Sequence, residues 1–139
     1  MKAFVITLIN NAKSVEVAQK CVESGKRHGI DIWNFEAFSP ADDPVSLLQT
    51  RGIDPIQFDE KYSRNLNCIS AFLSHYALWE QCIKSNETFV IFEHDAIVLA
   101  PIPETTFRYV MNIGAPSYGN WNTPKILGVN PLTTKRYFP

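Results

Sequence analysis

Two carboxylates close a short apolar run near the middle of the chain, and their spacing suits metal chemistry. The run Thr88–Phe92 is rich in β-branched and aromatic residues, which is typical of a buried strand, and Glu93-His94-Asp95 follows directly. If the extended conformation continued, Glu93 and Asp95 would share a face, with Cα atoms roughly 7 Å apart. Two such oxygen ligands suit one hard divalent cation. The alternative is an acidic strand end that turns toward solvent or caps a turn, and the triplet alone favours that alternative.

The N-terminal third predicts a βαβ unit. Lys2–Ile9 is an apolar strand candidate with two asparagines after it. A helical pattern then begins at Ser14, a plausible N-cap, and ends at Gly29, with cationic residues just before it. Asp31–Phe38 alternates between a polar and an apolar face, as a strand does. Strand, helix and strand in this order predict a right-handed, parallel unit.

A long helix is expected directly before the acidic strand. Asn67–Lys84 has apolar residues at three- and four-residue spacing, and two residues connect it to the strand. Between the βαβ unit and this helix, Asp43-Pro44 opens a short helix that ends near Gly52, and residues 53–64 are irregular. A further strand is predicted at Phe107–Ile113, whereas residues 115–139 are rich in Pro, Gly, Asn and Thr and show no strong period.

Composition sets limits on the class of protein. The 139 residues, 45% hydrophobic and 19% charged, are typical of one globular domain. A net charge of −1 argues against generic affinity for nucleic acid or an anionic membrane. No apolar run reaches the length of a membrane span, and Phe4–Ile9 is too short for a signal peptide, so we expect a cytoplasmic protein. Three widely spaced cysteines indicate buried thiols rather than a zinc site or disulfides.

Three stretches carry a resemblance to a known family. They are VITLIN at Val5–Asn10, FLSHYALWE at Phe72–Glu80 and FVIFEHDA at Phe89–Ala96, with FEAF at residues 35–38 as a weaker echo. In these stretches and their order the chain resembles glycosyltransferase family 25, the lipopolysaccharide-biosynthesis type that includes collagen galactosyltransferases. It departs from the family pattern at His94, the middle of the acidic triplet, and at Asn67 and Ser70, where the family tends to place glycine.

The resemblance implies a fold and an activity. The implied fold is α/β: a GT-A, Rossmann-like, mainly parallel sheet flanked by helices, which binds a nucleotide sugar outside the carboxyl ends of its strands. We expect residues 1–139 to form a single glycosyltransferase-like domain that lacks much of the second half of the family domain. The implied enzyme is an inverting hexosyltransferase of lipopolysaccharide or surface-glycan synthesis, which moves galactose from a UDP-sugar to a saccharide acceptor. The alternative is a truncated, non-catalytic module that binds nucleotide sugar.

The resemblance also assigns candidate site residues. Glu93 and Asp95 would bind Mn²⁺ or Mg²⁺ at the diphosphate, a role that the family context favours over the acidic strand end. The nucleotide-sugar site would include Thr7, Leu8, Asn10, His75 and Glu93.

Several of these residues have a structural alternative. His75 could equally be a satisfied core histidine, and Asn10 a simple turn residue. His94 should point to the opposite face from the acids and bond to structure. Ser74 could bond back to a helix carbonyl and do nothing else. Tyr118 and Trp121 could stack on a ligand, with packing as the default role. The general base that inversion requires is not identified.

Overall fold

The computed structural model describes residues 1–58, 64–104 and 106–114. These residues belong to two units, Met1–Pro101 and Ile102–Pro139, which we describe separately. The first unit contains every helix and strand of the described residues. In chain order these are β1 (Lys2–Thr7), α1 (Ala12–Arg27), β2 (Ile32–Glu36), the 3₁₀ turn η1 (Pro40–Asp42), α2 (Pro44–Gln49), the 3₁₀ turn η2 (Pro55–Gln57), α3 (Asn65–Ser85) and β3 (Phe89–Glu93).

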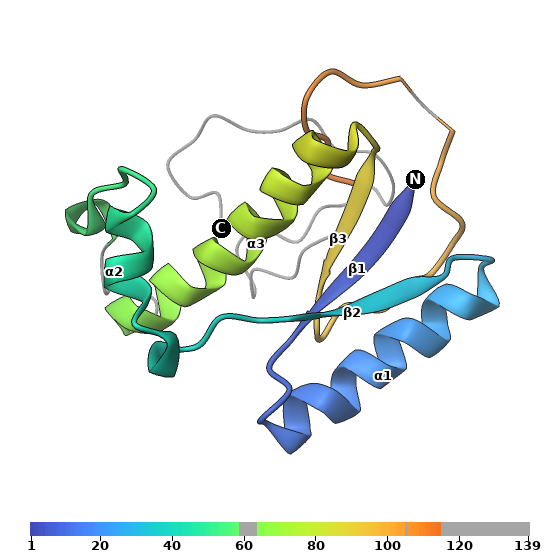
Figure 1. Ribbon diagram of the computed structural model, residues 1–139. Helices are drawn as coiled ribbons and strands as arrows, with labels where there is room; N and C mark the ends of the chain where they lie inside the picture. Colours follow the sequence, from blue (N-terminus) through green and yellow to red (C-terminus); the bar gives the residue numbers. More distant parts are fainter. Residues whose placement is uncertain (59–63, 105, 115–139) are drawn as a thin grey trace, which may run out of the picture. The chain divides into compact units, whose positions relative to one another are not determined.

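The sheet of the first unit is parallel, with the strand order β2-β1-β3 (Figure 1). Thr7 pairs in register with Glu36, and Ile6 pairs with Glu93, so the three strands end at the same edge. The strands predicted at Lys2–Ile9, Asp31–Phe38 and Thr88–Phe92 are therefore confirmed, as is their parallel arrangement. β1 ends at Thr7 rather than Ile9 because the Asn11 N–H donates to the Leu8 carbonyl at 2.9 Å and closes a turn.

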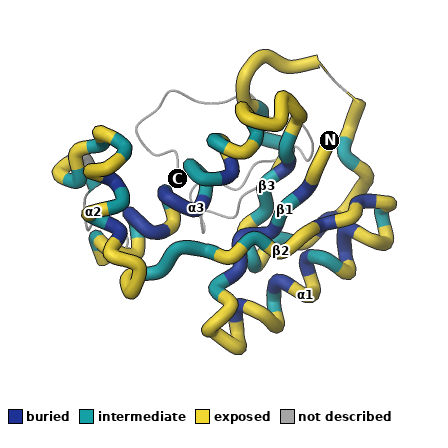
Figure 2. The backbone as a smooth tube through the Cα atoms, viewed as in Figure 1, coloured by how far each residue is buried: buried dark blue, intermediate teal, exposed yellow. Residues whose placement is uncertain are grey.

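Helices cover both faces of this sheet. Gly25 of α1 lies so close to Ile32 of β2 that a side chain at position 25 would collide with it. Ile32 pairs with Ala3, whereas Glu93, which contacts α3, pairs with Ile6. Because side chains alternate along a strand, Ala3 and Ile6 point to opposite faces, and α1 and α3 therefore lie on opposite faces of the sheet. Figure 2 shows the buried residues along β1 and along the inward sides of both helices.

The α1 helix begins differently from the prediction. Its N-cap is Asn11, whose side chain accepts the N–H groups of Lys13 and Ser14 at 3.0 Å each. Ser14 is therefore inside the first turn, and its hydroxyl accepts the Leu8 N–H at 3.0 Å instead. The predicted C-terminal signal is confirmed, since Gly29 has φ +73° directly after the helix.

The α3 helix packs against α2 in a second cluster of apolar side chains. Leu48, Ile69 and Leu73 are fully buried there. Partly buried residues surround them, namely Phe38, Val45, Leu47, Ile53, Phe58 and Phe72. α2 has the predicted caps, with Asp43 before Pro44 and Gly52 at φ +70° after the helix. None of the helices in the described part of the chain is long and apolar enough to span a bilayer.

The chain turns sharply after β3. The Ala96 N–H donates to the Glu93 carbonyl at 3.0 Å, which places His94 and Asp95 in the middle of a turn. The extended conformation on which a shared face for Glu93 and Asp95 depended therefore stops at Glu93. Two residues later, the Val98 N–H donates to the hydroxyl of Ser24 on α1 at 2.8 Å, so the chain then contacts α1.

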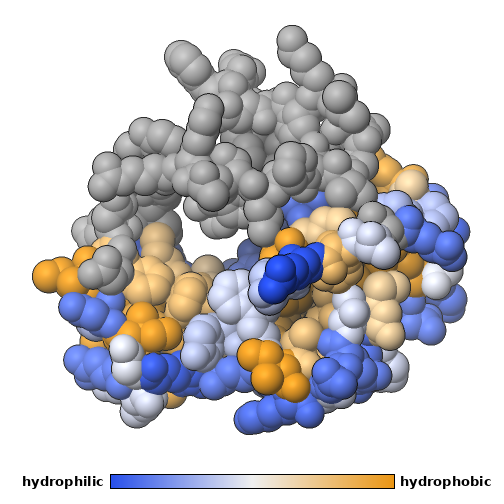
Figure 3. All heavy atoms as spheres, turned by 90° about the horizontal axis from the view of Figure 1, so that it is seen from above, coloured by the Kyte–Doolittle hydropathy of each residue, from blue (hydrophilic) through white to orange (hydrophobic). Residues whose placement is uncertain are grey.

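The described residues of the second unit contain a single isolated bridge, at Asn112. The predicted strand Phe107–Ile113 is wrong, because Tyr109 has φ +71° and interrupts any extended run. Tyr118 and Trp121 lie outside the described residues. Among the described residues, exposed hydrophobic side chains are scattered, and on the face shown in Figure 3 those drawn in colour form several separate groups.

Candidate functional site

The carboxyl edge of the sheet brings most of the predicted site residues together. Thr7 ends β1, and Glu93 ends β3 beside it. The backbone after β2 joins the same edge, where the Ala37 N–H donates to the Thr7 carbonyl at 2.9 Å. In open parallel sheets, ligands bind outside this edge, where the loops that follow the strands meet.

His75 of α3 and Glu93 of β3 form the most polar contact of this edge. The His75 Nε2 lies 2.7 Å from the Glu93 Oε1, and the two side chains are 30% and 54% exposed. An ionised carboxylate only accepts hydrogen bonds, so Nε2 must carry the proton in this contact. This hydrogen bond is the main reason why the pKa of Glu93 lies below its ordinary value of 4.5. Burial opposes the shift, and the charges of His75 and His94 add to it.

Asp95 has different surroundings from Glu93. It is exposed in the turn after β3, and its negative charge reaches Cys21, a fully buried residue of α1. Burial first, and the charge of Asp95 second, raise the pKa of the Cys21 thiol to about 11. Glu93 is thus bonded to α3, whereas Asp95 belongs to the turn that leads toward α1.

The different settings of Glu93 and Asp95 matter for the predicted metal site. The two carboxylates are oxygen donors of the kind that Mn²⁺ and Mg²⁺ prefer. However, no group of three or more His, Cys, Asp or Glu side chains among residues 1–58, 64–104 and 106–114 could hold a metal ion. The described residues alone therefore do not form a complete metal site, and we derive no chemical step through one.

The residues after β1 use their polar groups within the fold. Thr7 is 2% exposed, and its hydroxyl lies 3.2 Å from the Val5 carbonyl and 3.1 Å from the Asn34 Oδ1. Leu8 is partly buried and donates its N–H to Ser14. Asn10 is exposed in the turn that follows. Thr7 and Leu8 therefore shape the backbone of this edge, while Asn10 offers a side chain to solvent.

Ser74 has a role that the sequence indicated only in part. As predicted, its hydroxyl donates to a carbonyl of its own helix, that of Ser70, at 2.9 Å. The same hydroxyl also accepts the Phe38 N–H after β2, at 3.0 Å. The sequence analysis missed this second bond, as it missed the bond from Leu8 to Ser14. Small polar residues on the apolar faces of α1 and α3 were the available signal.

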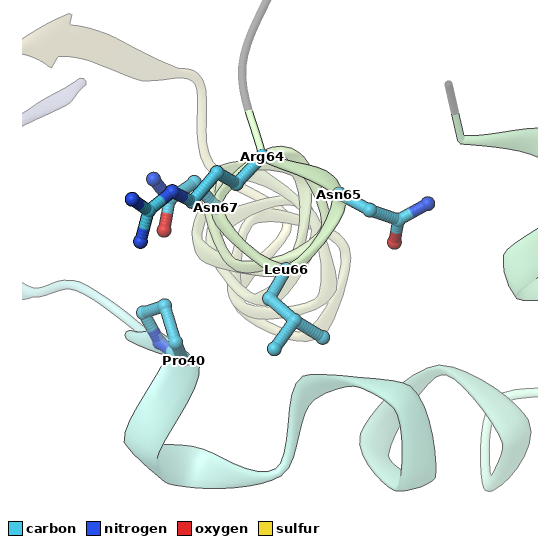
Figure 4. Close-up of a pocket in the computed structure, with 5 residues that line it drawn as sticks. All are labelled: Pro40, Arg64, Asn65, Leu66 and Asn67. Carbon is cyan, nitrogen blue, oxygen red and sulfur yellow. The ribbon is translucent and has the colours of Figure 1, made fainter. Parts of the chain in front are cut away.

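A pocket of about 270 Å³ lies at the N-terminus of α3. Its lining residues are Pro40, Arg64, Asn65, Leu66 and Asn67. Figure 4 shows the Arg64 and Asn67 side chains on the same side of the helix as Pro40, with Asn65 directed away from them. Arg64 carries a positive charge at this end of α3, where the helix dipole has its positive end.

The chain is similar to a known protein family. The model of glycosyltransferase family 25, described as an LPS biosynthesis protein, matches residues 1–111. The matched region includes all three strands, the Ser74-His75 pair and the acidic turn. No curated protein matches the chain.

Proposed function

This chain belongs to glycosyltransferase family 25, and we propose that it transfers galactose from UDP-galactose to a saccharide acceptor, with inversion. The family establishes the coarser statement: a glycosyltransferase of lipopolysaccharide biosynthesis, with a sugar donor and an acceptor as substrates. The identity of the sugar, the UDP carrier, the stereochemistry and the need for a metal are our proposals.

The observation that carries the proposal is the hydrogen-bonded pair of His75 and Glu93 at the carboxyl edge of the sheet. A carboxylate held in its ionised form is a suitable ligand for a metal ion, or an acceptor for hydroxyl groups of a nucleotide sugar. His75 fixes the orientation of this carboxylate from α3. The backbone after β1 and β2 borders the same edge, where the donor would bind.

The proposed reaction exchanges one bond at the anomeric carbon for another. The acceptor hydroxyl oxygen attacks this carbon, and the bond to the β-phosphate oxygen breaks, so UDP leaves with the bonding electrons. A general base takes the proton of the hydroxyl. We assign no residue as this base, because Glu93 is engaged by His75 and Asp95 is proposed as a metal ligand. The contribution proposed for the described residues is donor binding and orientation.

Mn²⁺ or Mg²⁺ is part of the proposal. Glu93 and Asp95 would supply carboxylate oxygens, and the diphosphate would supply further ones. Such an ion would provide positive charge for the departing diphosphate. Because Glu93 and Asp95 are held in different settings, the need for a metal ion must be measured directly, with Asp95→Asn as the variant.

The alternative function is a nucleotide-sugar-binding module without transferase activity. Residues 100–139 contain a single carboxylate, Glu104, and no histidine, so this segment offers few candidates for the missing base. The alternative requires only the donor side, which depends on residues of β1, α3 and β3.

The deciding experiment measures binding and turnover separately. Thermal unfolding with UDP, in the presence and absence of Mn²⁺, reports donor binding, because a ligand that binds only the native state raises the Tm. Release of UDP from UDP-galactose is then followed with and without saccharide acceptors. Acceptor-dependent release supports the transferase, and binding without release supports the module. A Tm that no uridine nucleotide changes would contradict both.

A further inference from the structure

Three segments that follow the strands are each held by a serine hydroxyl from a helix. In every case a backbone N–H of the segment donates to the hydroxyl oxygen. The bonds are Leu8 to Ser14 at 3.0 Å after β1, Phe38 to Ser74 at 3.0 Å after β2, and Val98 to Ser24 at 2.8 Å after β3. We refer to Ser14, Ser24 and Ser74 as the anchor serines.

The anchor serines are buried and oriented. Their exposed fractions are 4% for Ser14 and 0% for both Ser24 and Ser74. Ser74 donates its hydroxyl hydrogen to the Ser70 carbonyl at 2.9 Å, and Ser24 donates to the Cys21 carbonyl at 2.7 Å. With the hydrogen committed to the helix, a lone pair of each oxygen is free to accept the amide of the segment opposite.

The position of Ser74 links it to the proposed donor site. Ser74 and His75 are adjacent on α3, yet they contact opposite edge strands of the sheet. Ser74 binds the backbone after β2, and His75 binds Glu93 at the end of β3. One turn of α3 therefore fixes the ends of both strands that flank β1.

We infer that Ser14 and Ser74 are positioning residues for the nucleotide sugar, because they hold the backbone after β1 and β2 in the arrangement that the donor requires. This inference rests on the proposed function. Loop backbone tends to be mobile, and a partly buried N–H that loses its partner must find water or move. Removal of the anchor therefore displaces the loop, while the sheet itself remains.

Ser70 provides a matched control on the same helix. It is 3% exposed and donates to the Leu66 carbonyl at 2.7 Å, as Ser74 donates to Ser70. In the described part of the chain, however, Ser70 accepts no backbone amide. Ser70→Ala thus removes a buried hydroxyl and its bond within the helix, whereas Ser74→Ala also removes the partner of Phe38.

The test measures three quantities on the full 139-residue chain and on both variants. These are the free energy of unfolding in urea, the Kd for UDP, and the hydrogen-exchange rate of the Phe38 amide. We expect Ser74→Ala to lose at least as much stability as Ser70→Ala, because it also leaves the Phe38 N–H without its partner. Ser74→Ala should raise the Kd by at least about fivefold and accelerate exchange at Phe38, whereas Ser70→Ala should change the Kd by less than about twofold.

The outcomes separate this inference from the function on which it rests. If the parent binds UDP and Ser74→Ala binds it equally well, the inference is overturned while the proposed function stands. If the parent does not bind UDP, the proposed function is contradicted, and the anchoring is judged on exchange alone. Faster exchange of the Phe38 amide in Ser74→Ala, but not in Ser70→Ala, would support the anchoring by Ser74. Equal exchange in both variants would overturn it.

A second variant covers the case in which Ser74→Ala does not fold. Ser14→Ala removes the anchor of Leu8 at the start of α1, outside the cluster between α2 and α3. It should accelerate exchange of the Leu8 amide and raise the Kd for UDP by a similar factor. Unchanged exchange and an unchanged Kd would overturn the inference for the end of β1.

Discussion

The His75 Nε2 and the Glu93 Oε1 lie 2.7 Å apart and connect the middle of α3 to the end of β3. The residues are 18 positions apart in the sequence, and the contact exists because α3 runs antiparallel to the strand that follows it. A carboxylate at the end of a strand would otherwise be held only by its backbone. The pair therefore orients Glu93 and favours its ionised form.

This pair predicts a pH dependence of stability. The pKa of Glu93 is lowered from 4.5 in the folded protein, so its ionised form contributes stability above about pH 4.5, and this contribution is lost as the pH falls through the lowered pKa. Because Glu93 is more than half exposed, we expect Glu93→Gln to cost at most about 1 kcal/mol near pH 6, and nothing at a pH below the folded pKa. Urea unfolding across this range measures both values.

A double-mutant cycle with His75→Gln is the control for this prediction. If His75 is the cause of the lowered pKa, the pH-dependent difference in stability that Glu93→Gln produces should largely disappear when the imidazole is absent. An equal difference with and without His75 would mean that another group sets the pKa of Glu93.

The buried Cys21 gives a second prediction. With its pKa raised to about 11, the Cys21 thiol should react with a thiol reagent far more slowly in the native protein than in urea. Cys68 and Cys82, which are partly exposed, serve as internal references. Mass spectrometry of peptides after brief labelling identifies the modified residue. Rapid native labelling of Cys21 would contradict its burial against the sheet.

The elements of the first unit could be predicted because local signals agree there. The apolar run of β3, the caps of α2 and the three-four spacing of α3 all act within a few residues. Phe107–Ile113 has the composition of a strand, yet Tyr109 adopts a positive φ there. Composition carries no information on that single backbone angle, so the prediction failed.

The sequence analysis could name candidate residues but not their geometry. The sequence placed His75 and Glu93 in one site, and the structure brings them into contact. The sequence could not show that the chain turns after Glu93. The chain beyond this turn is held by a hydrogen bond from Val98 to Ser24, and these two residues are 74 positions apart in the sequence. Contacts of this kind depend on tertiary packing and leave little trace in a local pattern.

A further prediction concerns Asp95 and the dependence of UDP binding on a metal ion. If Asp95 contributes an oxygen ligand, Asp95→Asn should abolish the increase in UDP affinity that Mn²⁺ provides and leave the fold intact. Calorimetric titration of UDP with and without Mn²⁺ measures this effect. Asp31 is an exposed carboxylate directly before β2, at the opposite edge of the sheet. Asp31→Asn is therefore the control for the loss of one negative charge alone. An Asp95→Asn protein that retains the Mn²⁺ effect would exclude this residue as a ligand.

Glu93 carries the prediction on donor binding, and Glu87 provides a closely matched control. Both are carboxylates of the same segment, but Glu87 precedes β3 at the amino edge of the sheet, where it pairs with Lys2, while Glu93 ends the strand beside Thr7. Each change to glutamine removes one exposed negative charge and one ion pair, so general electrostatic and stability effects should be similar. Only Glu93→Gln alters the edge at which a parallel sheet binds its ligand.

We therefore expect Glu93→Gln to weaken UDP-galactose binding by at least about tenfold, which is the effect of losing one charged hydrogen-bonding group. Glu87→Gln should leave the affinity nearly unchanged. Equal losses in the two variants would place the donor elsewhere on the molecule.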